Sequence, residues 1–117
     1  MSKKQEAFLQ SLLERGIVDQ RKLSAVGNAK RLPNGEYGYV LMCLKDHMLN
    51  IYDTDFSQNV GELLYSINLR DITDLKTSTF IFNCYIKFTF QGFRYRIDNA
   101  LHKELYNAIK TEAKQIP

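Results

Sequence analysis

Apolar residues recur in this chain with two different spacings, one in the central segment and another on either side of it. Between Leu23 and Ile97, apolar side chains recur at every second position in short runs, which is the pattern of β-strands with one buried face. Polar turns that contain Gly, Pro, Asn or Asp separate these runs. On either side, residues 3–15 and 99–115 repeat apolar residues at helical spacing. The sequence therefore predicts a mostly β domain with a helix at each end.

Seven strands fit the central segment. Their expected ranges are 23–32, 36–45, 48–53, 63–70, 72–77, 80–90 and 93–97, and the fifth is expected to be short and weak. The fourth strand is expected to point its odd-numbered residues inward: Leu63, Tyr65, Ile67 and Leu69. Pro33-Asn34-Gly35 is predicted to be a turn between the first two strands.

The last two strands are predicted to form a hairpin. Gln91-Gly92 would be its two-residue loop, because glycine adopts a positive φ without steric cost. That loop would pair Thr89 with Arg94 and Lys87 with Arg96.

The two helices carry different signals. In the first, Phe8, Leu9, Leu12 and Leu13 share one face, and Gly16 favours a stop. In the second, Asp98 or Asn99 is expected to cap the first turn. Its buried stripe is predicted to be Leu101, Leu105, Ala108 and Ile109.

The second and third strands are apolar on both faces. A large exposed apolar patch is unusual on a monomeric protein, so something should cover the second face. The N-terminal helix is the nearest candidate, and a second subunit is the other. Removal of residues 1–16 is expected to expose this surface.

Composition limits the class of protein. A chain of 117 residues with 44% hydrophobic and 25% charged residues fits one globular domain. We expect residues 1–22 to be the helix and a connector, and residues 23–117 to be the β domain. The two cysteines lie in apolar runs, which favours a reducing, cytoplasmic location, with the periphery of a membrane as a second option. No apolar run approaches the roughly 18–20 residues of a membrane span, and the N-terminus lacks the apolar core of a signal peptide.

Four segments resemble the second half of a pleckstrin-homology-like (PH-like) domain, including its bacterial and GRAM-type relatives. They are LLYSINLRDI, FNCYIKFTF, the hairpin QGFRYRID and the closing helix ALHKELYNAIK. Residues 23–53 fit the first three strands of such a domain less specifically. Many members carry a tryptophan in the closing helix; this chain has none, so Leu105 or Tyr106 would fill that space.

The resemblance implies a fold and a kind of function. The fold would be a partly open, seven-stranded antiparallel barrel, capped by a C-terminal α-helix and here preceded by an N-terminal helix. The function would be that of a non-catalytic binding or scaffolding module without a cofactor. Its partners would be a protein or peptide along a sheet edge, another copy of the chain (a homo-oligomer) or an anionic membrane lipid. The alternative is a small barrel, or a small enzyme, with a ligand cavity among Phe82, Phe88, Phe93 and Tyr95.

A first candidate site follows from the resemblance. PH-like domains that bind phosphoinositides carry a basic motif around the first strand–strand loop, and the matching positions here are Lys30 and Arg31. The family's further arginine on the second strand is absent, because residues 36–39 read Glu-Tyr-Gly-Tyr. The other interpretation is that both side chains are solvated loop residues.

A second candidate is a basic patch on the last hairpin. Lys87, Arg94 and Arg96 would share one face with Tyr85, a composition that fits an anion or a single nucleic-acid strand. The alternative is a solvated face whose cations pair with Asp71, Asp74 or the closing helix. The net charge of +3 divides into +4, −5 and +4 over residues 1–35, 36–75 and 76–117. Because the middle third is acidic, the charge distribution does not favour a nucleic acid as the partner.

No catalytic or metal motif emerges. Asp53-Thr54-Asp55 resembles the start of a calcium loop, but Gln58 and Leu64 stand where glycine and a bidentate glutamate belong. Cys43, His47 and His102 match no spacing of metal ligands, and both cysteines are expected to be core residues.

Overall fold

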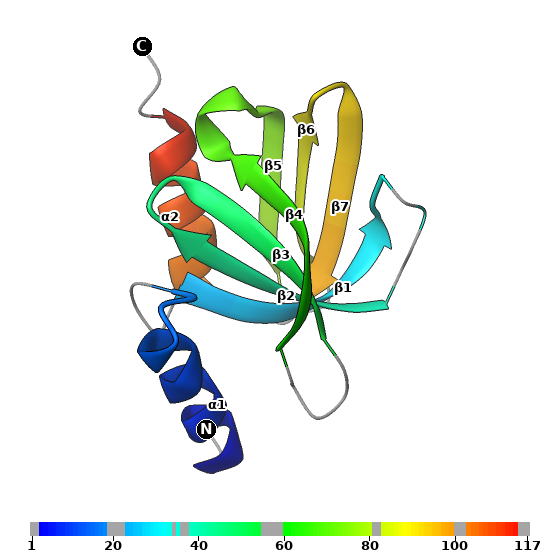
Figure 1. The fold of residues 1–117 in the computed structure, drawn as a ribbon. Coiled ribbons are helices and arrows are strands. Elements are labelled where there is room, and N and C mark those ends of the chain that lie inside the picture. Colours follow the sequence, from blue (N-terminus) through cyan, green and yellow to red (C-terminus); the bar gives the residue numbers. More distant parts are fainter. Residues whose placement is uncertain are drawn as a thin grey trace.

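The strands build one antiparallel sheet that folds over on itself. The computed structural model describes residues 3–18, 23–33, 35, 38–54, 60–80, 83–99 and 103–114. The elements are α1 (Lys3–Glu14), β1 (Ser24–Arg31), β2 (Gly38–Lys45), β3 (Met48–Thr54), β4 (Val60–Asn68), the 3-10 turn η2 (Leu69–Asp71), β5 (Thr73–Phe80), β6 (Asn83–Phe90), β7 (Phe93–Asn99) and α2 (Lys103–Lys114). The strand order is β4-β3-β2-β1-β7-β6-β5, and β2–β4 cross in front of β5–β7 in Figure 1. This is the predicted seven-stranded, partly open barrel with a helix at each end.

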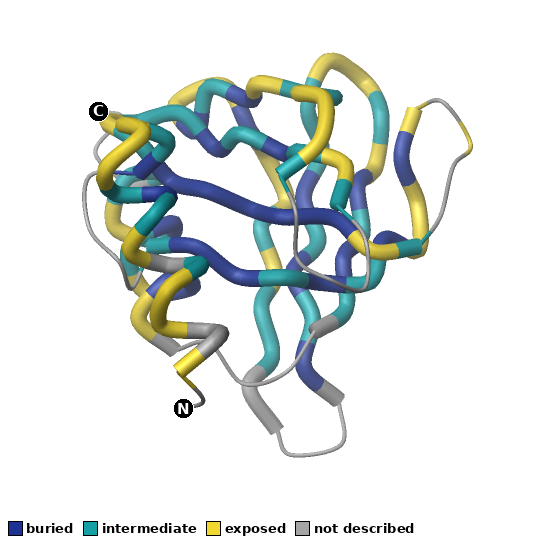
Figure 2. Tube along the Cα trace, turned by 60° about the horizontal axis from the view of Figure 1, so that its bottom comes forward, coloured by how far each residue is buried: buried dark blue, intermediate teal, exposed yellow. Residues whose placement is uncertain are grey.

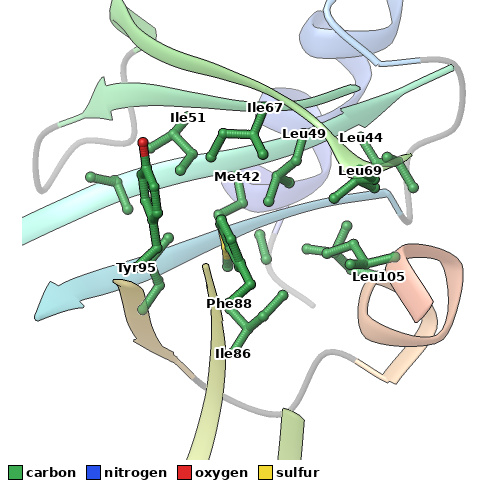
Figure 3. Close-up of a cluster of buried hydrophobic side chains, with 14 of the residues drawn as sticks. Met42, Leu44, Leu49, Ile51, Ile67, Leu69, Ile86, Phe88, Tyr95 and Leu105 are labelled. Carbon is green, nitrogen blue, oxygen red and sulfur yellow. The ribbon is translucent and has the colours of Figure 1, made fainter. Parts of the chain in front are cut away.

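The main core fills the space between the two halves of the sheet. Figure 2 shows buried residues concentrated on the strands in the middle of the molecule. Phe88 and Tyr95 stack with their ring centroids 4.9 Å apart, and in Figure 3 Phe88 points toward Met42. Both rings are almost fully buried. These two of the four proposed cavity aromatics are therefore packed core residues, and Phe82 lies outside the described residues.

α2 closes one side of the barrel. It packs against η2 and β5, and Leu105 points at Leu69 and Leu44 in Figure 3. Leu105 and Tyr106 are 0% and 1% exposed, so both side chains belong to the main core. Ile109 is also buried, whereas Leu101 lies outside the described residues.

α1 covers one apolar face of β2, as the sequence predicts for the nearer of its two candidates, although two of the residues expected to need this cover, Met42 and Leu44, lie in the main core. Leu12 and Val18 form a second buried cluster with Leu41 and Cys43 on the outer side of β2. Phe8, Leu13, Ile17 and Tyr52 are half-buried around this cluster. The side chain of Leu9 is not among those described.

α1 ends where glycine permits a left-handed turn. Gly16 has φ +72°, and its N–H donates to the carbonyl of Leu13 while the N–H of Ile17 donates to that of Leu12. These two bonds form a Schellman motif, with Leu12 and Ile17 as its hydrophobic pair. Lys45 of β2 donates to the Gly16 carbonyl at 2.6 Å, which ties the helix end to the sheet.

Three expectations about element ends are wrong. β5 is not short, because it runs for eight residues and takes in Phe80, so that β6 begins at Asn83. Asp98 and Asn99 do not cap α2. They extend β7 instead, where they pair with Asn28 and Gly27 of β1, and α2 begins at Lys103.

One expectation about β4 is also wrong. Leu63 was expected to point inward, yet it is 48% exposed. The register explains this, because Ile51 pairs with Tyr65 while its neighbour Tyr52 pairs with Leu63, which leaves one extra residue on β4. Such a bulge changes the face to which the following residues point. Ile67 is buried in the core and Tyr65 packs against it, as expected.

The last hairpin follows its prediction. Lys87 pairs with Arg96 and Thr89 with Arg94, and Gln91 and Gly92 have φ +51° and +80°. Both values are typical of a type I′ turn, which suits the twist of a hairpin.

This turn gives a matched pair of stability predictions. Gly92→Ala should lower the free energy of unfolding by about 1–2 kcal/mol, because a side chain in the left-handed region meets the following carbonyl. Gln91→Asn should be neutral or stabilising, because asparagine tolerates that region better. Urea denaturation of both variants measures the difference. If Gly92→Ala were as stable as the wild type, the positive φ would be incorrect.

Candidate functional site

The two predicted basic clusters lie at the same end of the sheet. β1 is antiparallel to β7, so the end of β1 lies beside the start of β7, and Arg31 pairs with Arg96. The turn after β1 is closed by the N–H of Gly35, which donates to the carbonyl of Leu32 at 2.9 Å. The β6–β7 hairpin brings Phe93 and Arg94 to that end. Arg31 thus joins the two candidate sites into one continuous surface.

The first candidate site borders an open depression of about 470 Å³. It is lined by Lys30, Arg31, Leu32, Pro33, Gly35 and Phe93. Lys30, Arg31 and Pro33 are exposed, and Phe93 is half-buried. We name Lys30, Arg31, Pro33, Phe93 and Arg94 the tip surface; it combines three cations with two apolar side chains. Residues 36 and 37, which follow this turn, lie outside the described residues.

The second candidate site borders another depression, of about 370 Å³. Its charged lining consists of five cations and one carboxylate: Arg31, Lys76, Lys87, Arg94, Arg96 and Asp74. Thr89 donates to Asp74 at 3.5 Å. Among the residues that the structure describes, Arg31, Lys76 and Arg94 have no ion-pair partner.

Four of these cations lie in a single row across four strands. Arg31 of β1 pairs with Arg96 of β7, which pairs with Lys87 of β6, which pairs with Lys76 of β5. Residues paired in this way point to the same face of a sheet, with about 4.8 Å between neighbouring strands. We name this set the cation row.

Bulges place both ends of the cation row. On β1, Ala29 pairs with Ile97 and Arg31 with Arg96, so Lys30 is an extra residue. On β5, the register shifts between Thr73 and Lys76, and Asp74 has φ +56°. Strict alternation would set Lys30 and Leu75 in these places instead, so the bulges re-aim Arg31 and Lys76.

The centre of the row is held by neighbouring side chains. Arg96 donates from Nε to Asp98 at 2.9 Å, and this hydrogen bond raises the pKa of Arg96 further above its ordinary value. The charged groups of Arg96 and Lys87 each lie 5.0 Å from the ring centroid of Tyr85. Cation–π contacts of this kind hold two like charges close together on the sheet.

The row is expected to cost stability. Like charges directly opposite one another on a sheet repel, whereas opposite charges contribute roughly 0.2–1 kcal/mol. Lys76→Glu should therefore raise the free energy of unfolding by about that amount at low salt. Lys110→Glu on α2 makes the same change of net charge away from the row and is the control. Denaturation in urea measures both, and a Lys76→Glu variant less stable than the wild type would contradict this.

In the described part of the chain, no three His, Cys, Asp or Glu side chains gather as metal ligands. Residues 55–59 of the calcium-like segment and His102 lie outside the described residues. Cys43 is fully buried, and burial raises the pKa of its thiol to about 12, so the thiol stays protonated and unreactive near neutral pH. None of the described helices is long and apolar enough to cross a membrane.

Lys76 is the site residue that the sequence did not indicate. It stands in a segment, DLKTST, that was expected to be a weak short strand, and its register depends on the bulge at Asp74. Arg31 was identified, but as part of a loop site and not as the neighbour of Arg96.

Comparison with solved structures identifies the fold. The chain is similar to the crystal structure of the pleckstrin homology domain of ArhGAP27, with a TM-score of 0.52 and 16% identity over 78% of this chain and 94% of that one. It is also similar to the apo structure of an activated truncation of Vav1, with a TM-score of 0.55 and 12% identity over 96% of this chain and 33% of that one. No family profile and no curated protein sequence matches.

Proposed function

We propose that this chain, which has a pleckstrin-homology-like fold, is a non-catalytic binding module that attaches to an anionic membrane surface through its tip surface. One observation carries the proposal. At the end of β1 and the start of β7, the cations Lys30, Arg31 and Arg94 surround two apolar side chains. These are Pro33 and the half-buried Phe93. Cations that meet lipid phosphates beside apolar side chains that enter the interface are the components of peripheral membrane binding.

Electrostatics favours the same orientation. Each Lys or Arg near an anionic bilayer contributes roughly 1 kcal/mol, and this falls away within a Debye length. Three exposed cations at one end can act together on a flat surface. The module would therefore bind at the periphery of a membrane, with its tip surface facing the bilayer.

Sedimentation with vesicles tests the function. The intact chain is mixed with phosphatidylcholine vesicles that contain about 30% phosphatidylserine or a few per cent of a phosphoinositide, and with pure phosphatidylcholine vesicles. We expect binding to the anionic vesicles only, weakened severalfold by raising the salt from physiological to about 0.5 M. Equal binding to neutral vesicles, or no binding to either anionic mixture, would rule the proposal out.

A second candidate function is association through a sheet edge. The sheet is open, with β4 and β5 as its end strands, and β4 exposes Leu63. End strands present unpaired backbone groups that a peptide or a second copy can pair with. The solution mass at rising protein concentration tests self-association. A concentration-dependent dimer that Leu63→Ser abolishes would favour this candidate, and a constant monomer would exclude the second copy.

A further inference from the structure

We infer that the cation row, which shares Arg31 with the tip surface, is a second binding site, for a soluble linear polyphosphate that lies across the strands. The inference goes beyond the proposed function, because it concerns the outer face of β1, β7, β6 and β5 and needs no lipid. It begins from the register that aligns Arg31, Arg96, Lys87 and Lys76.

The shape of the row selects an elongated anion. Three strand spacings separate its first and last cations, a length of about 14 Å. A single phosphate can contact at most two neighbouring cations at this spacing. A chain of phosphates that runs across the strands can meet all four, because the four cations are aligned by the register and line one depression.

The departures from regular strand pairing point to the same conclusion. Regular alternation would align three cations, Lys30, Arg96 and Lys87, and would set Leu75 of β5 opposite Lys87. The bulge on β1 puts Arg31 in the place of Lys30, and the bulge at Asp74 puts Lys76 in the place of Leu75. The bulge on β5 therefore extends the row from three cations to four, and bulges are over-represented where a sheet must re-aim a side chain at a site.

The charges of the row are not neutralised within the described residues. Asp98 holds Arg96, and Asp74 accepts a hydrogen bond from Thr89, but Arg31 and Lys76 at the two ends have no ion-pair partner there. A linear anion would neutralise both ends and the centre together. Repulsion within the row then becomes a driving force for binding, since the ligand removes it.

The aromatic residue beside the row argues for a phosphate chain and against a nucleic-acid strand. Single strands bind through bases that stack on free aromatic rings. The ring of Tyr85 is already engaged by Lys87 and Arg96, each 5.0 Å from its centroid. The ring therefore positions cations for phosphate and offers less surface to a base.

Isothermal titration of the intact chain tests the inference. The probes are inorganic phosphate, pyrophosphate and tripolyphosphate, compared at the same ionic strength. We expect affinity to rise about tenfold with each added phosphate, as each brings further charge-assisted hydrogen bonds. Lys76→Ala should weaken tripolyphosphate binding about tenfold while leaving inorganic phosphate unchanged. Arg15→Ala, at the end of α1, is the control and should change neither.

The outcomes separate this site from the membrane contact. Lys76→Ala should leave vesicle binding unaltered, whereas Lys30→Ala should weaken vesicle binding and spare tripolyphosphate. Equal affinity for one and three phosphates, no binding of any of them, or tighter binding of an oligothymidylate of equal charge would overturn the inference. Vesicle binding that survives those results would leave the proposed function intact, and tripolyphosphate binding without vesicle binding would remove only the proposed function.

Discussion

Replacing Leu12 with alanine should lower the free energy of unfolding by about 2–4 kcal/mol. Leu12 is 0% exposed and packs with Leu41, Cys43 and Val18 on the outer side of β2. Truncation removes its apolar contacts and leaves a cavity in a cluster that is much smaller than the main core. Chemical denaturation followed by circular dichroism measures the loss.

A neighbouring position on the same helix is the control. Gln10 is exposed on α1, and its Nε2 donates a long hydrogen bond of 3.5 Å to Oε1 of Glu14. Gln10→Ala therefore changes little besides helix propensity, which is higher for alanine. Its free energy of unfolding should stay within about 0.5 kcal/mol of the wild type. If Leu12→Ala were equally mild, α1 would not be docked on the sheet.

Reversing two charges of the tip surface should nearly abolish membrane attachment. The double variant Lys30→Glu with Arg94→Glu changes the charge facing the bilayer by four units. At roughly 1 kcal/mol for each charge near the surface, affinity for anionic vesicles should fall on the order of a hundredfold to a thousandfold. Both side chains are exposed, so the fold should be retained, which the melting temperature checks.

A second double variant separates a local effect from one of net charge. Arg15→Glu with Lys110→Glu changes the total charge by the same amount, directly after α1 and on α2, away from the tip surface. It should lower vesicle affinity by less than tenfold, since screening limits charges more than a Debye length from the bilayer. Equal losses in both double variants would mean that the whole protein's charge, and not the tip surface, attracts the membrane.

Alternation in the sequence was enough to predict most of the sheet. A two-residue loop fixes the register of a hairpin, so Gln91-Gly92 determined which residues of β6 and β7 face each other. The doubly apolar β2 likewise implied a cover, which α1 provides. Leu105 of α2 is buried as predicted, because helical spacing fixes which residues face the core.

Bulges explain the errors in side-chain direction. An inserted residue shifts every later side chain by one position, and no local residue signal marked the shifts at Lys30, Asp74 or Leu63. Asp74 adopts a left-handed φ that many residue types avoid. Because aspartate is common in ordinary turns, its presence in the sequence did not indicate a bulge at this position.

The end of β7 illustrates a different limit. Asp98 and Asn99 have good capping side chains, so local preference placed them at the start of α2. Pairing with Asn28 and Gly27 of β1 prevails, because it satisfies backbone groups of both strands. The same long-range pairing of β1 with β7 joins Arg31 to Arg96. The sequence therefore indicated two separate basic clusters where the fold has one continuous surface.

A nuclear magnetic resonance titration tests the central claim most directly. The ¹⁵N-labelled chain is titrated with a soluble phosphorylated inositol headgroup, and shifts of the backbone amides are mapped onto the sheet. We predict that the largest shifts fall on Lys30, Arg31, Phe93 and Arg94, with small ones on β3 and α1. Shifts concentrated on α1 or the β3–β4 end of the sheet, or no shifts at millimolar headgroup, would contradict a binding surface at the ends of β1 and β7.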